Sequence, residues 1–340
     1  MVNALAAHIE VHRWPKVDLH CHLEGAIRPT TVLDLYRKNG GVYKNATLEE
    51  LLPLIQVTGN ERSLFDFLAK FKTILPAIKT QLDIMRIAQE VTMDAYNDGV
   101  RYLELRYSPH LLRNSTGLDV QDVVDAVTIG VRLAMQQVEI HVEQIFIVPQ
   151  FAGPQVGEEM LQLALDNRAH GVQALDLAGD IRHIGMEAYT AVFHQAYEAG
   201  LGITVHAGEA APAESVRMAV EDLHATRIGH GIRSIEDENV ISLLRERDVL
   251  LEVCVTSNLQ TRVASSIETH PIRKLIEAGV RVSVNTDDPG ISNITLSDEY
   301  NLLMQEKDFD FSLFNALNRD ALNAAFTNDE RKAALQPVFV

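Results

Sequence analysis

The sequence has few of the residues that disulfide-rich or membrane-spanning proteins need. In a chain of 340 residues only Cys21 and Cys254 are cysteines, and they do not form a C-x-x-C pair. Two isolated thiols exclude a disulfide framework. No run of about 18 apolar residues occurs, and the first 16 residues contain no basic start followed by an apolar stretch. We therefore expect a cytoplasmic protein with no membrane contact.

Positive charge is also scarce. The chain carries 30 Lys and Arg against 47 Asp and Glu, which gives a formal net charge of −17. Such a chain repels phosphate backbones, so nucleic acid is not an expected partner, whereas a neutral or cationic small molecule is compatible with it. The H-E-x-x-H and P-loop motifs are absent, which excludes metalloproteases and P-loop enzymes of those types.

What the chain does contain is a regular alternation of strand-like and helix-like segments. The strand-like segments are rich in β-branched and other apolar residues and are bounded by Gly, Asp, Asn or Pro. They cover residues 16–22, 100–108, 143–149, 172–179, 202–208, 226–231, 248–254 and 280–288. An amphipathic helical segment, TQLDIMRIAQEVTMDAYNDG, ends at Gly99. Eight strands that alternate with helices predict a (β/α)8 barrel, formed by residues 1–340 as a single domain.

Residues 30–80 are too many for an ordinary loop after the first strand, and their pattern is helical. In SLFDFLAKF the residues Leu64, Phe67, Leu68 and Phe71 follow an i, i+3, i+4, i+7 spacing and form one apolar face. This face either packs on the core or forms a wall or lid at the mouth of the barrel. We expect a helical insertion at about 30–80 that caps the mouth.

Polar residues follow the predicted strands at their C-terminal ends. They are His20, His22, Asp176, His206, Glu209, His230, Asp287 and Asp288. In (β/α)8 enzymes that end of the barrel carries the active site. The concentration of ionisable side chains at one rim therefore predicts a catalytic site there.

The residue types favour a metal. His20 and His22 are two apart on a strand, so both imidazoles point to the same side and Cys21 points to the other. Each feature alone has an ordinary interpretation: an exposed pair of histidines, a hydrogen-bonded His206, or a turn cap before Pro289. Together, several histidines and an aspartate suit Zn²⁺ with a position open for water, and hence hydrolytic chemistry.

Seven motifs also resemble one family. HCHLEGA, RYSPHLL, DLAGD, TVHAGE, RIGHG, TSN and NTDDP occur in the order and spacing of the adenosine deaminase family of metal-dependent amidohydrolases, from about residue 15 to 335. The resemblance implies a (β/α)8 barrel, a purine nucleoside as the small-molecule partner, and one zinc ion per chain. The implied zinc ligands are His20, His22, His206 and Asp287.

The resemblance also implies roles around the purine ring. His230 and Asp287 would orient and deprotonate the water that attacks C6, and Glu209 would give a proton to N1. Asp288 would bind N7, and the backbone N–H of Gly179 would bind N3. The further substrate contacts that we expect are Glu24, Leu64, Phe67 and Leu68. As a hypothesis, Asp176 orients a zinc ligand.

Two positions depart from the family. Adenosine deaminases usually have Asp where this chain has Glu24, and their Asp meets the ribose, whereas adenine deaminases have Glu there. SLFDFLAKF and RYSPHLL are instead similar to the nucleoside enzymes, so adenosine is the expected substrate, with adenine or a 5′-modified adenosine as the alternative. IFIVPQF also lacks an arginine that is common in close relatives.

Other classes are compatible with parts of the pattern. A ligand-binding barrel without catalysis would not need the complete set of acid–base residues. A zinc hydrolase of esters or amides would leave Glu209 and Asp288 without a task. The zinc deaminases of a different fold carry P-C-x-x-C, which is absent here, so that class is excluded.

Overall fold

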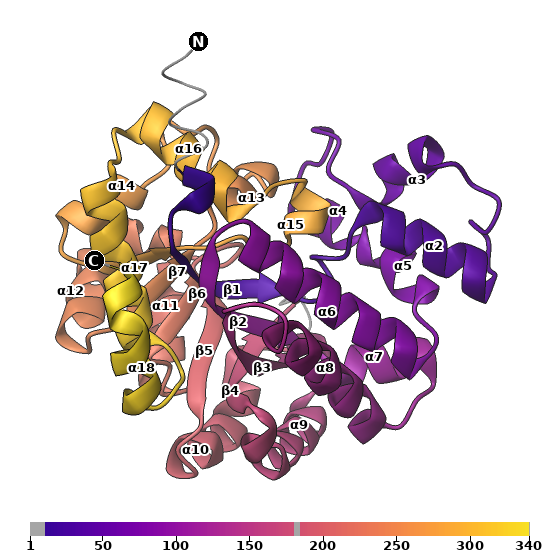
Figure 1. The fold of residues 1–340 in the computed structure, drawn as a ribbon. Helices are drawn as coiled ribbons and strands as arrows, with labels where there is room; N and C mark the ends of the chain where they lie inside the picture. The colour runs from indigo at the N-terminus through magenta and orange to yellow at the C-terminus, as the bar shows by residue number, and fades with distance from the viewer. Residues whose placement is uncertain (1–10, 180–183, 340) are drawn as a thin grey trace.

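The computed structural model describes residues 11–179 and 184–339, and at its centre is a barrel of eight parallel strands (Figure 1). Each strand pairs with the next one along the chain, from β1 to β8. The strands are β1 (Lys16–His22), β2 (Val100–Tyr107), β3 (His141–Pro149), β4 (Val172–Ala178), β5 (Gly202–Ala207), β6 (Arg227–His230), β7 (Leu250–Val253) and β8 (Arg281–Val284). The predicted (β/α)8 barrel is confirmed.

The barrel closes between β1 and the residues that follow β8. The backbone N–H of Asp287 donates to the carbonyl of His20 at 2.8 Å, and the N–H of His22 donates to the carbonyl of Asp287 at 2.7 Å. Cys21 and Asp287 form an isolated parallel bridge at the same place. The seam of the barrel therefore lies at the backbone of three of the proposed zinc ligands.

Helices surround the barrel, and local sequence explains their ends. At the start of α6, Thr80 and Asp83 form a capping box, and the helix ends at Asn97, two residues before Gly99. The helices outside the insertion are α6 (Gln81–Asn97), α7 (Pro109–Thr116), α8 (Val120–Met135), α9 (Pro154–Asp166), α10 (Thr190–Glu198), α11 (Ala213–Glu221), α12 (Glu238–Glu246), α13 (Val255–Gln260), α14 (Ile272–Glu277), α15 (Pro289–Ser292), α16 (Leu296–Lys307), α17 (Phe311–Ala324) and α18 (Asp329–Leu335). Within the described residues, no helix is both long and apolar enough to cross a bilayer.

The segment after β1 is helical and lies to one side of the barrel (Figure 1). It contains α2 (Pro29–Asn39), α3 (Leu48–Ile55), α4 (Leu64–Leu68), α5 (Phe71–Ile74) and a 3₁₀ turn at Leu75–Ala77. SLFDFLAKF, whose spacing predicted one apolar helical face, is divided between α4 and α5. The N–H groups of Lys70 and Lys72 bond three residues back instead of four, which tightens the chain and separates α4 from α5.

The last strand is shorter than the sequence indicated. β8 ends at Val284, so Asp287 and Asp288 lie in the following loop and not at the strand end. Asp287 has a φ of 63°, which is outside the extended region, so its backbone does not prolong the strand. The loop turns across the barrel mouth, where Asp287 pairs with β1 and does not continue along β7.

Candidate active site

Four ionisable side chains meet at the C-terminal rim of the barrel. His20 and His22 come from the end of β1, His206 from β5 and Asp287 from the loop beyond β8, and one ligand atom of each lies within 4.8 Å of all the others. The Nε2 atoms of His20 and His22 are 3.2 Å apart. Oδ1 of Asp287 lies 3.3 and 3.2 Å from these two nitrogens. Imidazole nitrogen and carboxylate oxygen are donors that Zn²⁺ accepts, so these residues fit the metal that the sequence predicts.

Backbone geometry allows the rings to lie this close. A Cβ atom at Gly229 would lie 2.9 Å from Cε1 of His20 and 3.3 Å from the ring of His206. His230 and Asp287 both have positive φ angles, 61° and 63°. Such angles cost non-glycine residues energy and are concentrated at functional sites. The two residues hold strained conformations at the positions where their side chains turn toward the cluster.

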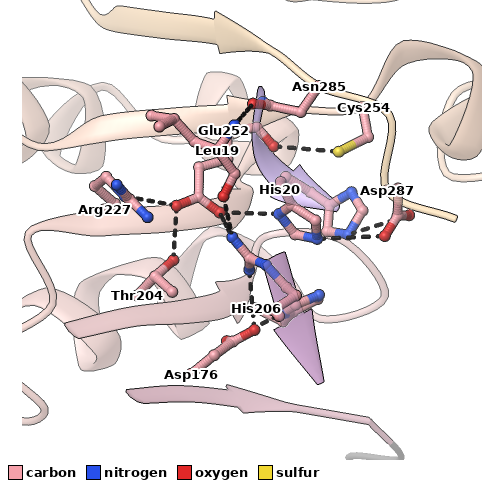
Figure 2. A network of polar contacts seen from close by, with 12 residues as sticks. Leu19, His20, Asp176, Thr204, His206, Arg227, Glu252, Cys254, Asn285 and Asp287 are labelled. Atoms are coloured by element: carbon pink, nitrogen blue, oxygen red, sulfur yellow. Dashed lines mark hydrogen bonds and ion pairs between the residues drawn. The ribbon is translucent and has the colours of Figure 1, made fainter. Parts of the chain in front are cut away.

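Two of the three histidines of the cluster, His20 and His206, are bound from behind by a carboxylate (Figure 2). Nδ1 of His20 lies 2.9 Å from Oε2 of Glu252, and Nδ1 of His206 lies 3.0 Å from Oδ1 of Asp176. A carboxylate accepts the Nδ1–H proton, which leaves the lone pair of Nε2 directed at the metal position. Asp176 therefore lies where an orienting residue for His206 has to be.

One guanidinium group connects these two carboxylates. Arg106 on β2 donates through Nη1 to Asp176 at 2.9 Å and through Nη2 to Glu252 at 2.7 Å. Nε of Arg227 binds the other oxygen of Glu252 at 2.7 Å. All four side chains are fully buried. Burial alone would raise the pKa of Asp176, but His206 and Arg106 outweigh it and lower that pKa to about 2.

Arg106 and Glu252 were not among the residues predicted from the sequence. Both are charged residues inside apolar strand segments, VRYLELRYS and DVLLEVC. An ionisable side chain inside a barrel strand is buried and must be paired, because an unpaired buried charge is very unfavourable. A charged residue inside an apolar strand segment is therefore the pattern that could have indicated Arg106 and Glu252.

The proposed acid–base residues lie beside the metal cluster. Nε2 of His230 is 3.8 Å from Oε2 of Glu209 and 3.9 Å from Oδ2 of Asp287. Burial, with Asp287 and Asp288 nearby, raises the pKa of Glu209 to about 8. Glu209 is therefore protonated at neutral pH and can donate a proton. Its Oε1 atom is buried without a hydrogen-bond partner among the described residues.

A cavity of about 830 Å³ opens next to these groups. The insertion supplies a large part of its apolar wall, and the residues from that segment are Leu64, Phe65, Phe67, Leu68, Ala69, Phe71, Lys72, Leu75 and Pro76. Phe67 is fully buried, and the apolar face that the sequence indicated on SLFDFLAKF faces the cavity despite the break between α4 and α5. Of the two interpretations, the geometry favours a pocket wall.

The remaining predicted contacts also line this cavity. Glu24, Gly179 and Asp288 are all part of its surface. Glu24 is buried, accepts from the N–H of Ser108 at 3.0 Å, and has its pKa raised to about 6 by burial. Burial and Asp287 raise the pKa of Asp288 well above its usual range, and its Oδ1 atom has no hydrogen-bond partner among the described residues. Two unpartnered carboxyl oxygens, on Glu209 and Asp288, thus face one cavity.

A (β/α)8 barrel that gathers histidines and aspartate at its C-terminal rim, beside a buried protonated glutamate, has the architecture of a metal-dependent amidohydrolase. Comparison with known proteins gives the family. The model of the family described as Adenosine deaminase matches residues 15–338, and the chain belongs to this family.

Curated relatives match the chain over nearly its whole length. Adenosine deaminase of Shewanella loihica is 38% identical over 322 residues, which cover 94% of this chain and 97% of the relative. Adenosine deaminase of Photorhabdus laumondii is 38% identical over 323 residues, covering 95% and 96%. The resemblance seen in the seven motifs is confirmed.

Several solved structures have a similar fold, and two of them are named as deaminases of different substrates. Adenine deaminase from Arthrobacter aurescens has a TM-score of 0.89 at 26% identity, covering 96% of this chain and 98% of that one. The Arabidopsis N6-mAMP deaminase has a TM-score of 0.88 at 29% identity, covering 97% and 99%. An amidohydrolase from Burkholderia ambifaria with bound zinc has a TM-score of 0.90 at 25% identity, covering 98% and 92%.

Proposed function

We propose that this chain hydrolyses adenosine and 2′-deoxyadenosine to the corresponding inosine and ammonia, with one zinc ion held by His20, His22, His206 and Asp287. The observation that carries this proposal is the pair of unpartnered carboxyl oxygens on Glu209 and Asp288, buried in a cavity beside the metal cluster. Buried polar atoms are normally hydrogen-bonded, so these two await a ligand with nitrogen atoms to bind. The edge of a purine ring supplies such atoms.

The reaction adds water to C6 of the purine and expels its amino group. A bound zinc ion lowers the pKa of water toward ~7, so that hydroxide is available at neutral pH. His230 and Asp287 face this position and together orient and deprotonate the attacking water. The new bond forms between oxygen and C6, and the proton that Asp287 took from the water passes to the amino group. The bond from C6 to nitrogen then breaks to release ammonia, and the proton left on the oxygen returns to Glu209 as the C6 carbonyl forms.

Glu209 provides the proton that makes C6 reactive. Because its pKa is raised to about 8, it carries a proton at neutral pH and gives it to N1 of the purine. Protonation of N1 draws electrons from C6 as the oxygen attacks. Asp288 binds N7 and the backbone of Gly179 binds N3, which fixes the ring between the acid and the attacking water.

The remaining cavity residues take the sugar and exclude water. Glu24 meets the ribose side, and Leu64, Phe67 and Leu68 cover the mouth. The barrel and the insertion act together as a single domain of residues 1–340. This is supported by hydrogen bonds of 2.9 Å from Val57 N to the carbonyl of Ile291 and from Gln56 Nε2 to that of Gly290. These bonds join the insertion to α15, which directly follows Asp287 and Asp288.

The test is an absorbance assay of purified protein with adenosine, 2′-deoxyadenosine and adenine side by side, with metal analysis of the same sample. We expect rapid conversion of the two nucleosides and about one zinc per chain. A zinc-loaded protein that converts none of the three substrates would contradict the proposal, and simple esters would then test the more general hydrolase.

The alternative substrates are adenine and 5′-modified adenosines, and Glu24 is the observation that favours them. Its side chain is longer than the usual aspartate, is buried in the cavity wall and takes space on the sugar side. Glu24→Asp should raise kcat/KM for adenosine if Glu24 merely fits the ribose poorly. If the variant instead loses adenine turnover, the free base is the substrate, and if neither rate changes, Glu24 does not determine specificity.

A further inference from the structure

Two buried side chains, Asn258 and His270, form a hydrogen-bonded row behind His230. Asn258 on α13 lies between two imidazoles, with Nδ2 3.1 Å from Nδ1 of His230 and Oδ1 3.2 Å from Nε2 of His270. The backbone N–H of Ile272 lies 3.3 Å from Nδ1 of His270. His230, Asn258 and His270 are each at most 2% exposed. The row therefore runs from a backbone amide to His230 with no water between its members.

The backbone N–H of Ile272 determines which group donates and which accepts in every hydrogen bond of the row. A backbone N–H can only donate, so Nδ1 of His270 has to accept and carries no proton. A neutral imidazole then has its proton on Nε2, which donates to Oδ1 of Asn258. Asn258 consequently turns its NH₂ group to His230, and Nδ1 of His230 accepts from it. The single proton of neutral His230 is left on Nε2.

The reverse assignment of donors and acceptors is incompatible with the N–H of Ile272. If Asn258 presented its oxygen to His230, its NH₂ group would face Nε2 of His270, and the proton of His270 would have to lie on Nδ1. Two N–H groups would then oppose each other at 3.3 Å. A doubly protonated His270 would create the same conflict. Burial, with Lys307 nearby, lowers the pKa of His270 to about 4, so this side chain is neutral at physiological pH.

We propose that Asn258 and His270 are positioning residues that hold His230 as the Nε2–H tautomer, which makes His230 a hydrogen-bond donor to the attacking oxygen and leaves Asp287 as the base. Nε2 of His230 faces Oδ2 of Asp287 at 3.9 Å. The water proton passes to Oδ2 of Asp287, the oxygen bonds to C6, and His230 keeps its own proton throughout. The tautomer rests on hydrogen-bond geometry alone, whereas its catalytic role rests on the proposed function.

The tautomer is measured directly by nuclear magnetic resonance. Zinc-loaded protein labelled with ¹⁵N-histidine gives two-bond proton–nitrogen correlations that separate protonated from unprotonated ring nitrogens. The signals of His230 are assigned by their loss in His230→Gln. We expect an unprotonated Nδ1 and a protonated Nε2 on His230 at neutral pH. A proton on Nδ1 would overturn the proposal whether or not the protein deaminates adenosine, so this failure is distinct from failure of the proposed function.

Adding a negative charge at residue 258 tests the role of the row in catalysis. In Asn258→Asp a carboxylate accepts from both imidazoles, which moves the proton of His230 to Nδ1 and leaves Nε2 bare. We expect kcat to fall roughly 10- to 100-fold, with KM for adenosine nearly unchanged and the His230 signals exchanged. The matched control is Asn167→Asp, which places a carboxylate at a buried amide before β4, at the opposite end of the barrel. Unchanged kcat and unchanged His230 signals in Asn258→Asp would overturn the proposal.

Conservative rescue separates positioning from packing. Glutamine at residue 270 accepts from Ile272 through its carbonyl and donates to Asn258 through its amide, so His270→Gln should keep the tautomer and most of kcat. His270→Phe fills the space but removes both hydrogen bonds, and it should lower kcat and allow Asn258 to turn over. If His270→Gln folds but loses as much kcat as Asn258→Asp and exchanges the His230 signals, the row does not work as proposed. The His270→Gln test remains decisive even if His270→Phe fails to fold.

Discussion

Replacing Arg106 by methionine removes the guanidinium that connects the carboxylates behind two proposed zinc ligands. Arg106 donates to Asp176, to Glu252 and, at 2.6 Å, to the carbonyl of Leu19. Glu252 keeps a second cation, because Arg227 binds its other oxygen. Among the described residues Asp176 has only Arg106 as a permanently charged partner. The substitution therefore leaves one buried carboxylate uncompensated and not two.

The expected loss of stability follows from this single uncompensated carboxylate. Removing one partner of a buried ion pair costs about 3–5 kcal/mol, so we expect Arg106→Met to lose about this much unfolding free energy. Asp176→Asn in the same chain removes the unpaired charge but keeps an oxygen for Nδ1–H of His206. The double variant should then be more stable than Arg106→Met alone, with a coupling energy of about 2 kcal/mol.

The assay is urea unfolding of the four proteins of this cycle. The fluorescence of Trp14, the single tryptophan, reports the transition. Zinc affinity measured by competition with a chelator should fall roughly 10- to 100-fold in both single variants. The control is Arg113→Met, because its pair with Glu159 is partly exposed and is worth at most about 1 kcal/mol. Additive losses of stability, or full zinc affinity and full rate in Asp176→Asn, would refute the reasoning.

Three further changes test other parts of the site and the barrel. Glu209→Gln keeps the shape but cannot give up a proton, so kcat should fall roughly 10²- to 10⁴-fold at unchanged zinc content; an active variant would remove Glu209 as the acid. Gly229→Ala places a methyl group 2.9 Å from Cε1 of His20, so zinc should be held more weakly in a chelator competition, and unchanged affinity would show that the rings can shift. Burial raises the pKa of Glu299 from 4.5 to about 7, so its contribution to stability is full below pH 4.5 and is lost as the pH rises through 7. Glu299→Gln does not titrate, so its stability relative to the unmodified protein should rise by up to about 3 kcal/mol over that interval. The same difference in unfolding free energy between the two proteins at pH 5 and at pH 8 would contradict this.

Local patterns predicted the barrel and most of the site. The two-residue spacing of His20 and His22 places both imidazoles on one side of a strand, and β1 has the predicted bounds. His206 and His230 follow from the same rule, because parallel strands in a barrel end at one rim. That these side chains lie close together could be predicted because the inference needs only the period of a strand and the direction of the barrel.

The parts that the sequence did not show depend on contacts between distant segments. Arg106 meets Asp176 and Glu252 across the barrel interior, 70 and 146 residues away. Asn258 was part of a recognised motif, but its link to His230 spans 28 residues and nothing local indicates it. The end of β8 was also misplaced, because Asp287 adopts a left-handed conformation that no neighbouring residue dictates.

The seam of the barrel has a consequence for folding. It joins the first strand to the segment beyond the last one, and Leu19 N donates to Oδ1 of Asn285 at a sequence separation of 266 residues. A contact of this range forms late, because a very long loop has to close first. Zinc held by the proposed ligands would bind the closed chain and not the unfolded one, and would thus stabilise this last step by mass action. The proposed metal would then hold the seam closed in addition to its chemical role, and amide exchange at His22 and Asp287 should slow when zinc is added.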